Sequence, residues 1–69
     1  MKLMSLEQFK KLKKGDVISV LVNGKYVNAT VKYEAFESCN LENILGDGDD
    51  WEVETDIGFV HNDSAYVSE

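Results

Sequence analysis

The sequence predicts a small, mainly β domain with one short helix near its start, and three observations support this prediction. The dipeptide Asn23-Gly24 lies between two runs rich in β-branched and aromatic residues, which is the strongest short-range signal for a tight β-hairpin. Residues 51–55 alternate strictly, with a glutamate at every second position, as in a half-buried strand. Ser5-Leu6-Glu7-Gln8 matches the capping box that opens a helix. A chain of this length is expected to form a single domain over residues 1–69.

The first expected element is a helix over residues 5–14. Leu6, Phe9 and Leu12 recur every three residues and form one apolar stripe. Four lysines follow within residues 10–14, where positive charge suits the negative end of the helix dipole. Gly15 is expected to end the helix. So short a helix is unstable alone in water, and we therefore expect it to dock through its apolar stripe.

The hairpin is the best-defined element of the sequence. A two-residue type I′ turn at Asn23-Gly24 sets the register, and the four expected opposing pairs are Val22 with Lys25, Val20 with Val27, Ile18 with Ala29, and Asp16 with Val31. Opposing residues share one face of a sheet, which gives this face the apolar set Ile18, Val20, Val22, Val27, Ala29 and Val31. The opposite face carries further apolar residues, namely Val17, Leu21, Tyr26 and Phe36. We expect either the helix or a partner to cover them, and favour the helix.

The second half of the chain is expected to hold a long acidic loop and three short strands. Residues 37–50 lack a clear pattern and contain Gly46-Asp47-Gly48-Asp49-Asp50, and loops of this length are often functional. In the strand that follows, Trp51, Val53 and Thr55 face away from Glu52 and Glu54. A turn at 56–58, a strand at 59–61, a single helical or 3₁₀ turn at 62–65 and a last strand at 66–67 complete the chain.

This order of elements resembles the SH3-like small barrel, and most closely its Tudor-type versions. The similar stretches are Lys14-Gly15-Asp16-Val17, residues 24–31 and residues 51–58. The resemblance covers about residues 14–67 and implies a five-stranded barrel over residues 16–67. Tudor domains bind methylated lysine or arginine in an aromatic cage between two loops. Here only Tyr26 lies near the first loop and Asp56-Ile57-Gly58 supplies no aromatic residue, so no cage is expected. The chain also resembles small uncharacterised proteins of phages and prophages, which implies no function.

The net charge of −6 conceals a marked division of charge along the chain. All seven lysines lie in residues 1–32, whereas residues 33–69 contain eleven of the thirteen acidic residues and no basic one. Such asymmetry indicates either attraction between the two halves of one fold or an interaction surface. With a pI near 4.6, direct binding of DNA or RNA is unlikely despite the lysines at 10–14. The acidic half is instead compatible with mimicry of a phosphate array.

The sequence offers little for catalysis or for a metal. It has one histidine, His61, and one cysteine, Cys39, and no evident third group would orient a Cys–His pair. An EF-hand loop beginning at Asp47 fails because Glu52 occupies the required glycine position and Gly58 the required glutamate position. We therefore expect no enzyme activity, no cofactor and no metal site.

The cellular setting is expected to be cytoplasmic. A single cysteine suits a reducing compartment, no signal peptide is recognisable, and no stretch approaches the ~20 apolar residues of a membrane helix. A core this small gains from association, so a monomer or weak homodimer is expected.

The function that these observations favour is a non-enzymatic protein-binding module, acting as a phage-type accessory or inhibitor protein. Its unidentified protein partner is expected to contact the loop and the acidic strand. The candidate partner-binding residues are Leu41, Ile44, Leu45, Asp47, Asp49, Asp50, Trp51, Glu52 and Glu54. The alternative is an acidic nucleic-acid mimic or a nucleic-acid-associated small barrel. Binding through the apolar loop residues should survive high salt, whereas mimicry should weaken steeply.

Overall fold

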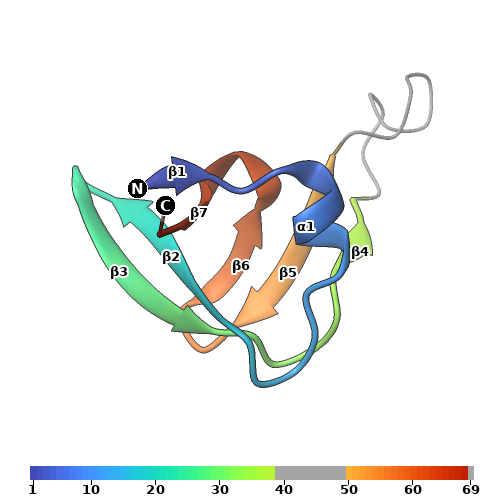
Figure 1. Ribbon diagram of the computed structural model, residues 1–69. Coiled ribbons are helices and arrows are strands. Elements are labelled where there is room, and N and C mark those ends of the chain that lie inside the picture. Colours follow the sequence, from blue (N-terminus) through green and yellow to red (C-terminus); the bar gives the residue numbers. More distant parts are fainter. Residues whose placement is uncertain (39–49, 69) are drawn as a thin grey trace.

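The computed structural model describes residues 1–38 and 50–68, which form two antiparallel β-sheets and one short helix (Figure 1). The first sheet has the strand order β1-β7-β2-β3 and the second the order β4-β5-β6. The strands are β1 Lys2–Leu3, β2 Val17–Val22, β3 Lys25–Thr30, β4 Phe36–Glu37, β5 Trp51–Thr55, β6 Gly58–His61 and β7 Ala65–Val67. The mainly β class is confirmed. The count of five strands is wrong, because the two-residue segments β1 and β4 pair with β7 and β5.

The predicted hairpin is confirmed, with three of its four predicted pairs: Val22 with Lys25, Val20 with Val27, and Ile18 with Ala29. The fourth pair, Asp16 with Val31, lies beyond the paired strands, where the Val31 N–H donates to the Asp16 carbonyl and the Val31 carbonyl accepts the Gly15 N–H instead. Asn23 and Gly24 have φ angles of 50° and 79°, and positive φ at both central residues is what a type I′ turn requires. The inner face is buried only toward the base of the hairpin, where Ile18, Val20, Ala29 and Val31 lie. Val22 and Val27, nearer the tip, are exposed.

The C-terminal elements also follow the predicted order. Val53 and Thr55 are buried, whereas the intervening Glu52 and Glu54 lie on the other face of β5. Asp56-Ile57 form the turn, and Gly58 adopts a φ of 114°, a conformation that favours glycine. A 3₁₀ turn, η1 Asn62–Ser64, then leads into β7.

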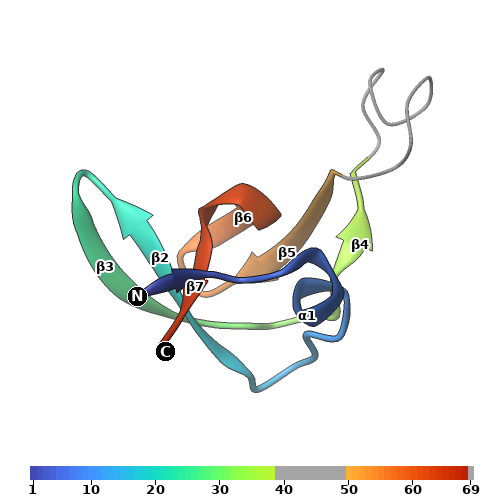
Figure 2. The same ribbon diagram turned by 45° about the horizontal axis from the view of Figure 1, so that its top comes forward.

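The two sheets meet where the chain continues past β3. Val31 forms a single antiparallel bridge with Thr55 of β5. Beside it, the Lys32 N–H donates to the Glu54 carbonyl at 2.8 Å, and the Asp56 N–H donates to the Thr30 carbonyl at 3.1 Å. The segment that leaves β3 therefore passes from one sheet to the other, as Figure 2 shows. This crossing sets the two inner faces against each other.

The helix is shorter than predicted. Helix α1 spans Leu6–Lys10, begins with the predicted capping box between Ser5 and Gln8, and ends at Lys11. Beyond it, the Lys13 N–H donates to the Asp16 carboxylate at 3.1 Å and the Gly15 N–H to the Val31 carbonyl at 2.9 Å. These bonds draw residues 13–16 into the base of the hairpin. The prediction of a helix to residue 14 missed this competition, and Gly15, with a φ of 98°, serves the hairpin entrance instead.

The core lies between the two sheets and includes the N-terminal segment. Its buried apolar residues are Met4, Phe9, Leu12, Ile18, Val20, Ala29, Val31, Val53, Val60 and Ala65. The helix thus docks by inserting Phe9 into the core, on the side of the molecule where β4 and β5 lie, and Leu12, just beyond the helix, is buried in the same core (Figures 1 and 2).

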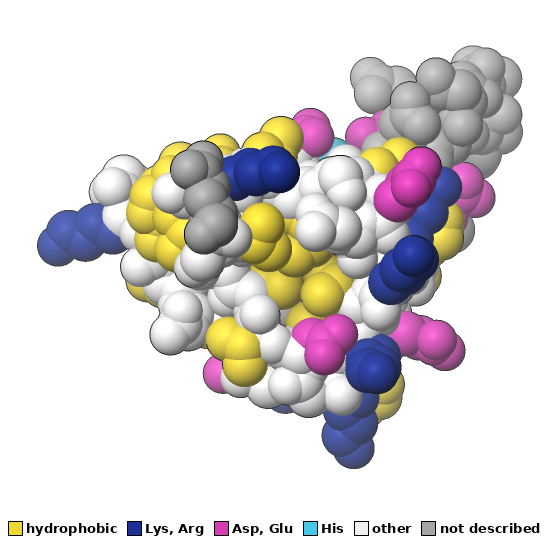
Figure 3. Space-filling view, viewed as in Figure 1, with side chains coloured by type: hydrophobic (Ala, Val, Ile, Leu, Met, Phe, Trp, Pro, Cys, Tyr) yellow, Lys and Arg dark blue, Asp and Glu magenta, His cyan; other side chains and the backbone are white. Residues whose placement is uncertain are grey.

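The favoured prediction that the helix covers the outer face of the hairpin is wrong. Val17 remains 61% exposed and Tyr26 47% exposed, because Phe9 of the helix and the adjoining Leu12 are buried in the core instead. Figure 3 shows apolar side chains gathered on the side of the molecule where the hairpin tip and both termini lie. In the part of the chain that the structure describes, no helix is long and apolar enough to cross a membrane.

Candidate functional site

Four of the nine predicted partner-binding residues lie in the described structure, at or in β5. They are Asp50, Trp51, Glu52 and Glu54. The other five, Leu41, Ile44, Leu45, Asp47 and Asp49, fall outside the described residues. The predicted loop 37–50 begins too early, because Glu37 belongs to β4, where it pairs with Trp51. The Ser38 N–H donates to the Asp50 carbonyl at 2.8 Å. Ser38 and Asp50, the described residues on either side of residues 39–49, are therefore neighbours in space.

Trp51 lies on the opposite face of β5 from the two glutamates, as the alternation predicted. Its half-buried ring packs against the core, and the Lys10 ammonium lies 5.1 Å from the ring centroid. Its backbone N–H donates to the Asn62 Oδ1 at 3.0 Å. These contacts connect the start of β5 to α1 and to η1. Trp51 is therefore a structural contact between elements, on the side away from Glu52 and Glu54.

Glu52 and Glu54 share the outer face of the second sheet with two aromatic residues and a histidine. Glu52 lies between Phe36 of β4 and His61 of β6, and Glu54 lies opposite Phe59 of β6. The Phe36 and Phe59 rings meet edge to face, with centroids 6.1 Å apart and an interplanar angle of 87°, a favourable aromatic geometry. We refer to Phe36, Glu52, Glu54, Phe59 and His61 as the acid–aromatic face.

Hydrogen bonds fix the polar end of this face. The Ser38 hydroxyl donates to the Glu52 Oε2 at 3.0 Å. The His61 Nδ1 accepts the Asp63 N–H at 3.0 Å, so a neutral imidazole carries its proton on Nε2 and donates it to the Asp50 Oδ1, also at 3.0 Å. His61 thereby caps the 3₁₀ turn and is held between two carboxylate-bearing residues. It is oriented as a structural group, and Cys39, the other member of the Cys–His pair that the sequence analysis rejected, lies outside the described residues.

The described residues show neither a metal-binding cluster nor ion pairing between the two halves of the chain. No group of three or more histidine, cysteine, aspartate or glutamate side chains in residues 1–38 and 50–68 is placed to hold a metal ion. In the same ranges the ion pairs join His61 to Asp50 and to Asp63, and none involves a lysine. Of the two explanations for the divided charge, direct pairing of lysines with carboxylates is therefore not seen.

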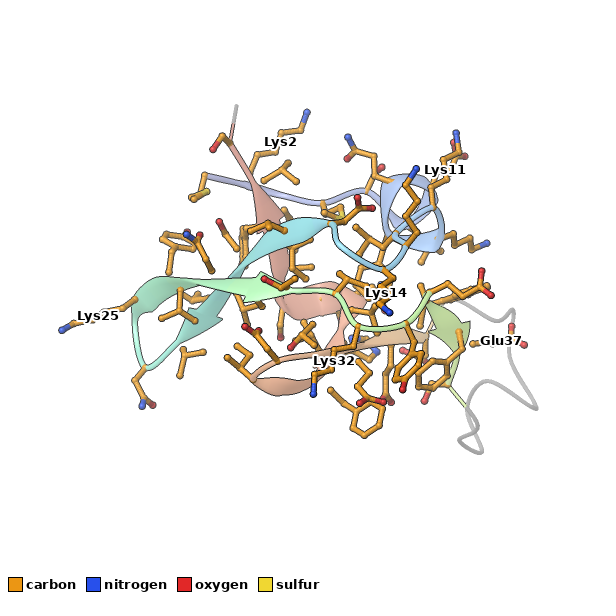
Figure 4. All side chains as sticks on the ribbon, turned by 90° about the horizontal axis from the view of Figure 1, so that it is seen from below. Lys2, Lys11, Lys14, Lys25, Lys32 and Glu37 are labelled. Atoms are coloured by element: carbon orange, nitrogen blue, oxygen red, sulfur yellow. The ribbon has the colours of Figure 1, made fainter. Side chains whose placement is uncertain are left out.

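Two of the lysines, Lys14 and Lys32, line a cavity at the junction of the two sheets. The cavity of about 420 Å³ is lined by Lys14, Gly15, Thr30, Val31, Lys32, Tyr33 and Glu54. Figure 4 shows Lys14 and Lys32 near the segment that leads from β3 to β4. Glu54 is the only residue that this cavity shares with the acid–aromatic face, and the cavity was not predicted from the sequence.

Phe36, Phe59 and His61 are the members of the site that were not among the predicted partner-binding residues; His61 lies opposite Glu52. Phe59 could have been found, because the register around the turn at 56–57 places it opposite Glu54, by the same rule that fixed the first hairpin. Phe36 could not, because its pairing with Glu52 joins two segments that are far apart in the sequence, and no turn motif between them sets the register. The apolar pattern had placed Phe36 with Val17, Leu21 and Tyr26, but it belongs to the other sheet.

Comparison of the chain with family models, with curated proteins and with solved structures finds no match.

Proposed function

We propose that the chain is a non-enzymatic protein-binding module that contacts a protein partner through its acid–aromatic face. The observation that carries this proposal is the mixture of side chains on one open sheet face. Phe59 is 65% exposed and Phe36 is 41% exposed, and the carboxylates of Glu52 and Glu54 lie between their strands. A purely solvated face has no need of two large aromatic side chains.

The chemistry of this face favours a partner that presents basic side chains beside apolar ones. A few residues supply most of the binding energy at protein interfaces, aromatic residues are enriched there, and an aromatic ring also attracts a cation over its face. Carboxylates beside the rings orient the same cation and raise the rate of encounter. A lysine or arginine of the partner would thus meet a ring and a carboxylate together, and an apolar neighbour would pack on the remaining ring.

The predicted loop residues remain part of the proposed contact. Ser38 and Asp50, which flank residues 39–49, are hydrogen-bonded to Glu52 and His61 of the acid–aromatic face. The candidate contact residues Leu41, Ile44, Leu45, Asp47 and Asp49 fall between these two flanking residues in the sequence and lie outside the described structure. In this proposal they extend the contact, and the chain acts as an accessory protein or inhibitor of the partner.

The resemblance to an SH3-like small barrel, and with it the closure of the two sheets into a barrel, remains a proposal. It is supported by the passage of the chain from the first sheet to the second at Thr30–Val31 and by the 3₁₀ turn before the last strand. The proposed binding face lies on the outside of the second sheet and does not depend on barrel closure.

The runner-up function is mimicry of nucleic acid by the acidic half of the chain. Its support is the excess of carboxylates in residues 33–69. Phe36 and Phe59 interrupt the described carboxylates on the acid–aromatic face, which favours a mixed apolar and ionic contact. The two functions differ in their dependence on salt, because screening weakens exposed charge pairs and leaves apolar contacts.

Capture of a partner at two salt concentrations tests the proposal. The wild-type chain is immobilised on a support and incubated with nuclease-treated lysate. It is then washed at about 0.1 M and at about 1 M salt, a range over which the Debye length falls from ~10 to ~3 Å. We expect one partner to persist through both washes. Phe59→Ser should lose this partner and Glu54→Gln should weaken its retention. The matched control Val17→Ser, which changes an exposed residue of the other sheet, should retain it.

Two results would count against the proposal. Equal retention by wild type, Phe59→Ser and Val17→Ser would place the contact elsewhere. Release of a DNA-handling protein by the second wash, together with insensitivity to Phe59→Ser, would favour mimicry.

A further inference from the structure

We propose that the open edge of β3 is a self-association site, through which two copies of this chain pair antiparallel and join their first sheets. This site belongs to the first sheet and is independent of the acid–aromatic face. Among the described residues β3 is the terminal strand of the first sheet, and β2 is the one strand that pairs with it. The tip of the β2–β3 hairpin projects away from the second sheet in Figures 1 and 2.

The direction of each backbone group on β3 follows from the hydrogen bonds made by Thr30 and Val31. In an antiparallel ladder, alternate residues direct their N–H and C=O groups to the same neighbouring strand. The Val31 N–H donates to the Asp16 carbonyl at 2.8 Å, on the β2 side. Thr30 therefore points to the other side, where its N–H donates to the Asp56 Oδ1 at 3.0 Å and its carbonyl accepts the Asp56 N–H.

Two positions earlier along the strand, the same outward side is open. Asn28 and Tyr26 have the same parity as Thr30, so their N–H and C=O groups also point away from β2. In the described residues, no protein group bonds to them. Asp56 thus satisfies the outward backbone groups of Thr30, whereas those of Asn28 and Tyr26, between Thr30 and the turn at Asn23-Gly24, have no partner among the described residues. An unprotected edge of this kind is a template for another strand.

Side chains at the tip give a second strand apolar contacts on both faces. Val22 and Val27 are exposed on the inner face, and Leu21 and Tyr26 are exposed on the outer face. The Tyr26 ring already meets the Tyr66 ring of β7 edge to face, with centroids 5.2 Å apart. A strand added beside β3 would therefore extend the sheet and cover apolar area above and below it.

A second copy is the occupant that this edge fits. A two-fold contact brings the same patch of both copies together, so the patch must be complementary to itself. Lys25 is the only charged residue between Val22 and Thr30, whereas the whole chain has a net charge of −6. The tip is therefore a place where two copies can approach without opposing their carboxylates. Figure 4 shows Lys25 extending outward from this end of the hairpin.

One register uses every free group. With Val27 on the two-fold axis, Tyr26 of each copy faces Asn28 of the other, and four hydrogen bonds satisfy all the outward N–H and C=O groups of these residues. Lys25 of one copy then faces Ala29 of the other, next to the Thr30 that holds Asp56. Opposite charges thus approach at both ends of the pairing, while the two Val27 side chains meet at its centre.

Sedimentation equilibrium over a concentration series tests the pairing. Wild type should rise from the 7.8 kDa of one chain toward twice that mass. Val27→Lys places two like charges opposite each other, a juxtaposition costly enough to weaken dimerisation tenfold or more. The control Val17→Lys makes the same change at an exposed position of the same sheet and should dimerise like wild type. An equimolar mixture of Val27→Lys and Val27→Asp should regain the dimer.

A covalent readout keeps the test decisive if a lysine variant does not fold. In a Cys39→Ser background, Val27→Cys should form a disulfide-linked dimer on mild oxidation, because directly opposed residues at the axis lie within disulfide reach. Val17→Cys should remain unlinked. A wild-type chain that stays monomeric throughout, a dimer unaffected by Val27→Lys, or equal cross-linking of the two cysteine variants would each overturn the proposal.

Discussion

Thr30 and Asp56 are bonded to each other twice across the junction of the two sheets. The Asp56 carboxylate accepts the Thr30 N–H at 3.0 Å, and the Asp56 N–H donates to the Thr30 carbonyl at 3.1 Å. Asp56 thus satisfies both outward backbone groups of Thr30, the last residue of β3, at the point where the chain turns toward β5. This pair marks the end of the β3 edge and the start of the crossing.

Asp56→Ala should destabilise the protein by about 1 kcal/mol, because it removes the acceptor of the Thr30 N–H at an exposed site where water replaces part of the bond. Urea unfolding followed by the fluorescence of Trp51, the only tryptophan, measures the change. Asp63→Ala is the control, since the Asp63 carboxylate is exposed and lies 3.7 Å from the nearest His61 nitrogen. Its effect should stay within about 0.5 kcal/mol. Equal losses in the two variants would contradict the role given to Asp56.

Val20→Asp should unfold the domain, whereas Glu52→Gln should leave it folded. Val20 is 5% exposed in the core between the sheets, and an unpaired charge there costs several kcal/mol, comparable with the whole stability of a small domain. Glu52 lies on the outer face, where glutamine can still accept the Ser38 hydroxyl. Circular dichroism and amide dispersion in NMR spectra distinguish the two outcomes. A folded Val20→Asp variant would mean that the inner face of the hairpin has been misassigned.

Gly58→Ala should cost about 1–2 kcal/mol through backbone strain. Gly58 has a φ of 114°, and a Cβ added there would meet no atom within 4 Å, so no steric clash contributes. Gly24→Asn is the comparison, because Gly24 has a φ of 79° in equally open space and asparagine tolerates the left-handed region better than other residues. Thermal unfolding should show a clearly larger loss for Gly58→Ala. Equal loss in both variants would indicate that the two turns tolerate side chains alike.

Elements fixed by local chemistry were predictable from the sequence. The Asn23-Gly24 turn determines a register that involves only neighbouring residues, and the capping box at Ser5 is confirmed for the same reason. The end of the helix was not predictable in this way. It depends on Asp16 and Val31, which capture the backbone of residues 13–15 from outside the helix.

The candidate site shows the same division. The alternation of Glu52 and Glu54 against Val53 was visible in the sequence and is confirmed. Phe36 joins them only through the pairing of β4 with β5, a contact between segments separated by residues 38–50. Turn chemistry says nothing about such a register. The same limit applied to β1, whose pairing with β7 joins the two ends of the chain.

Chemical-shift mapping with the captured partner tests the central claim most directly. The isotope-labelled chain is titrated with that partner, and the backbone amide shifts are followed residue by residue. We predict that the largest changes fall on Phe36, Glu52, Glu54, Phe59 and His61, the acid–aromatic face of the second sheet. Changes confined to Leu21, Tyr26 and Tyr66 on the first sheet, with the acid–aromatic face unperturbed, would contradict the proposed binding function.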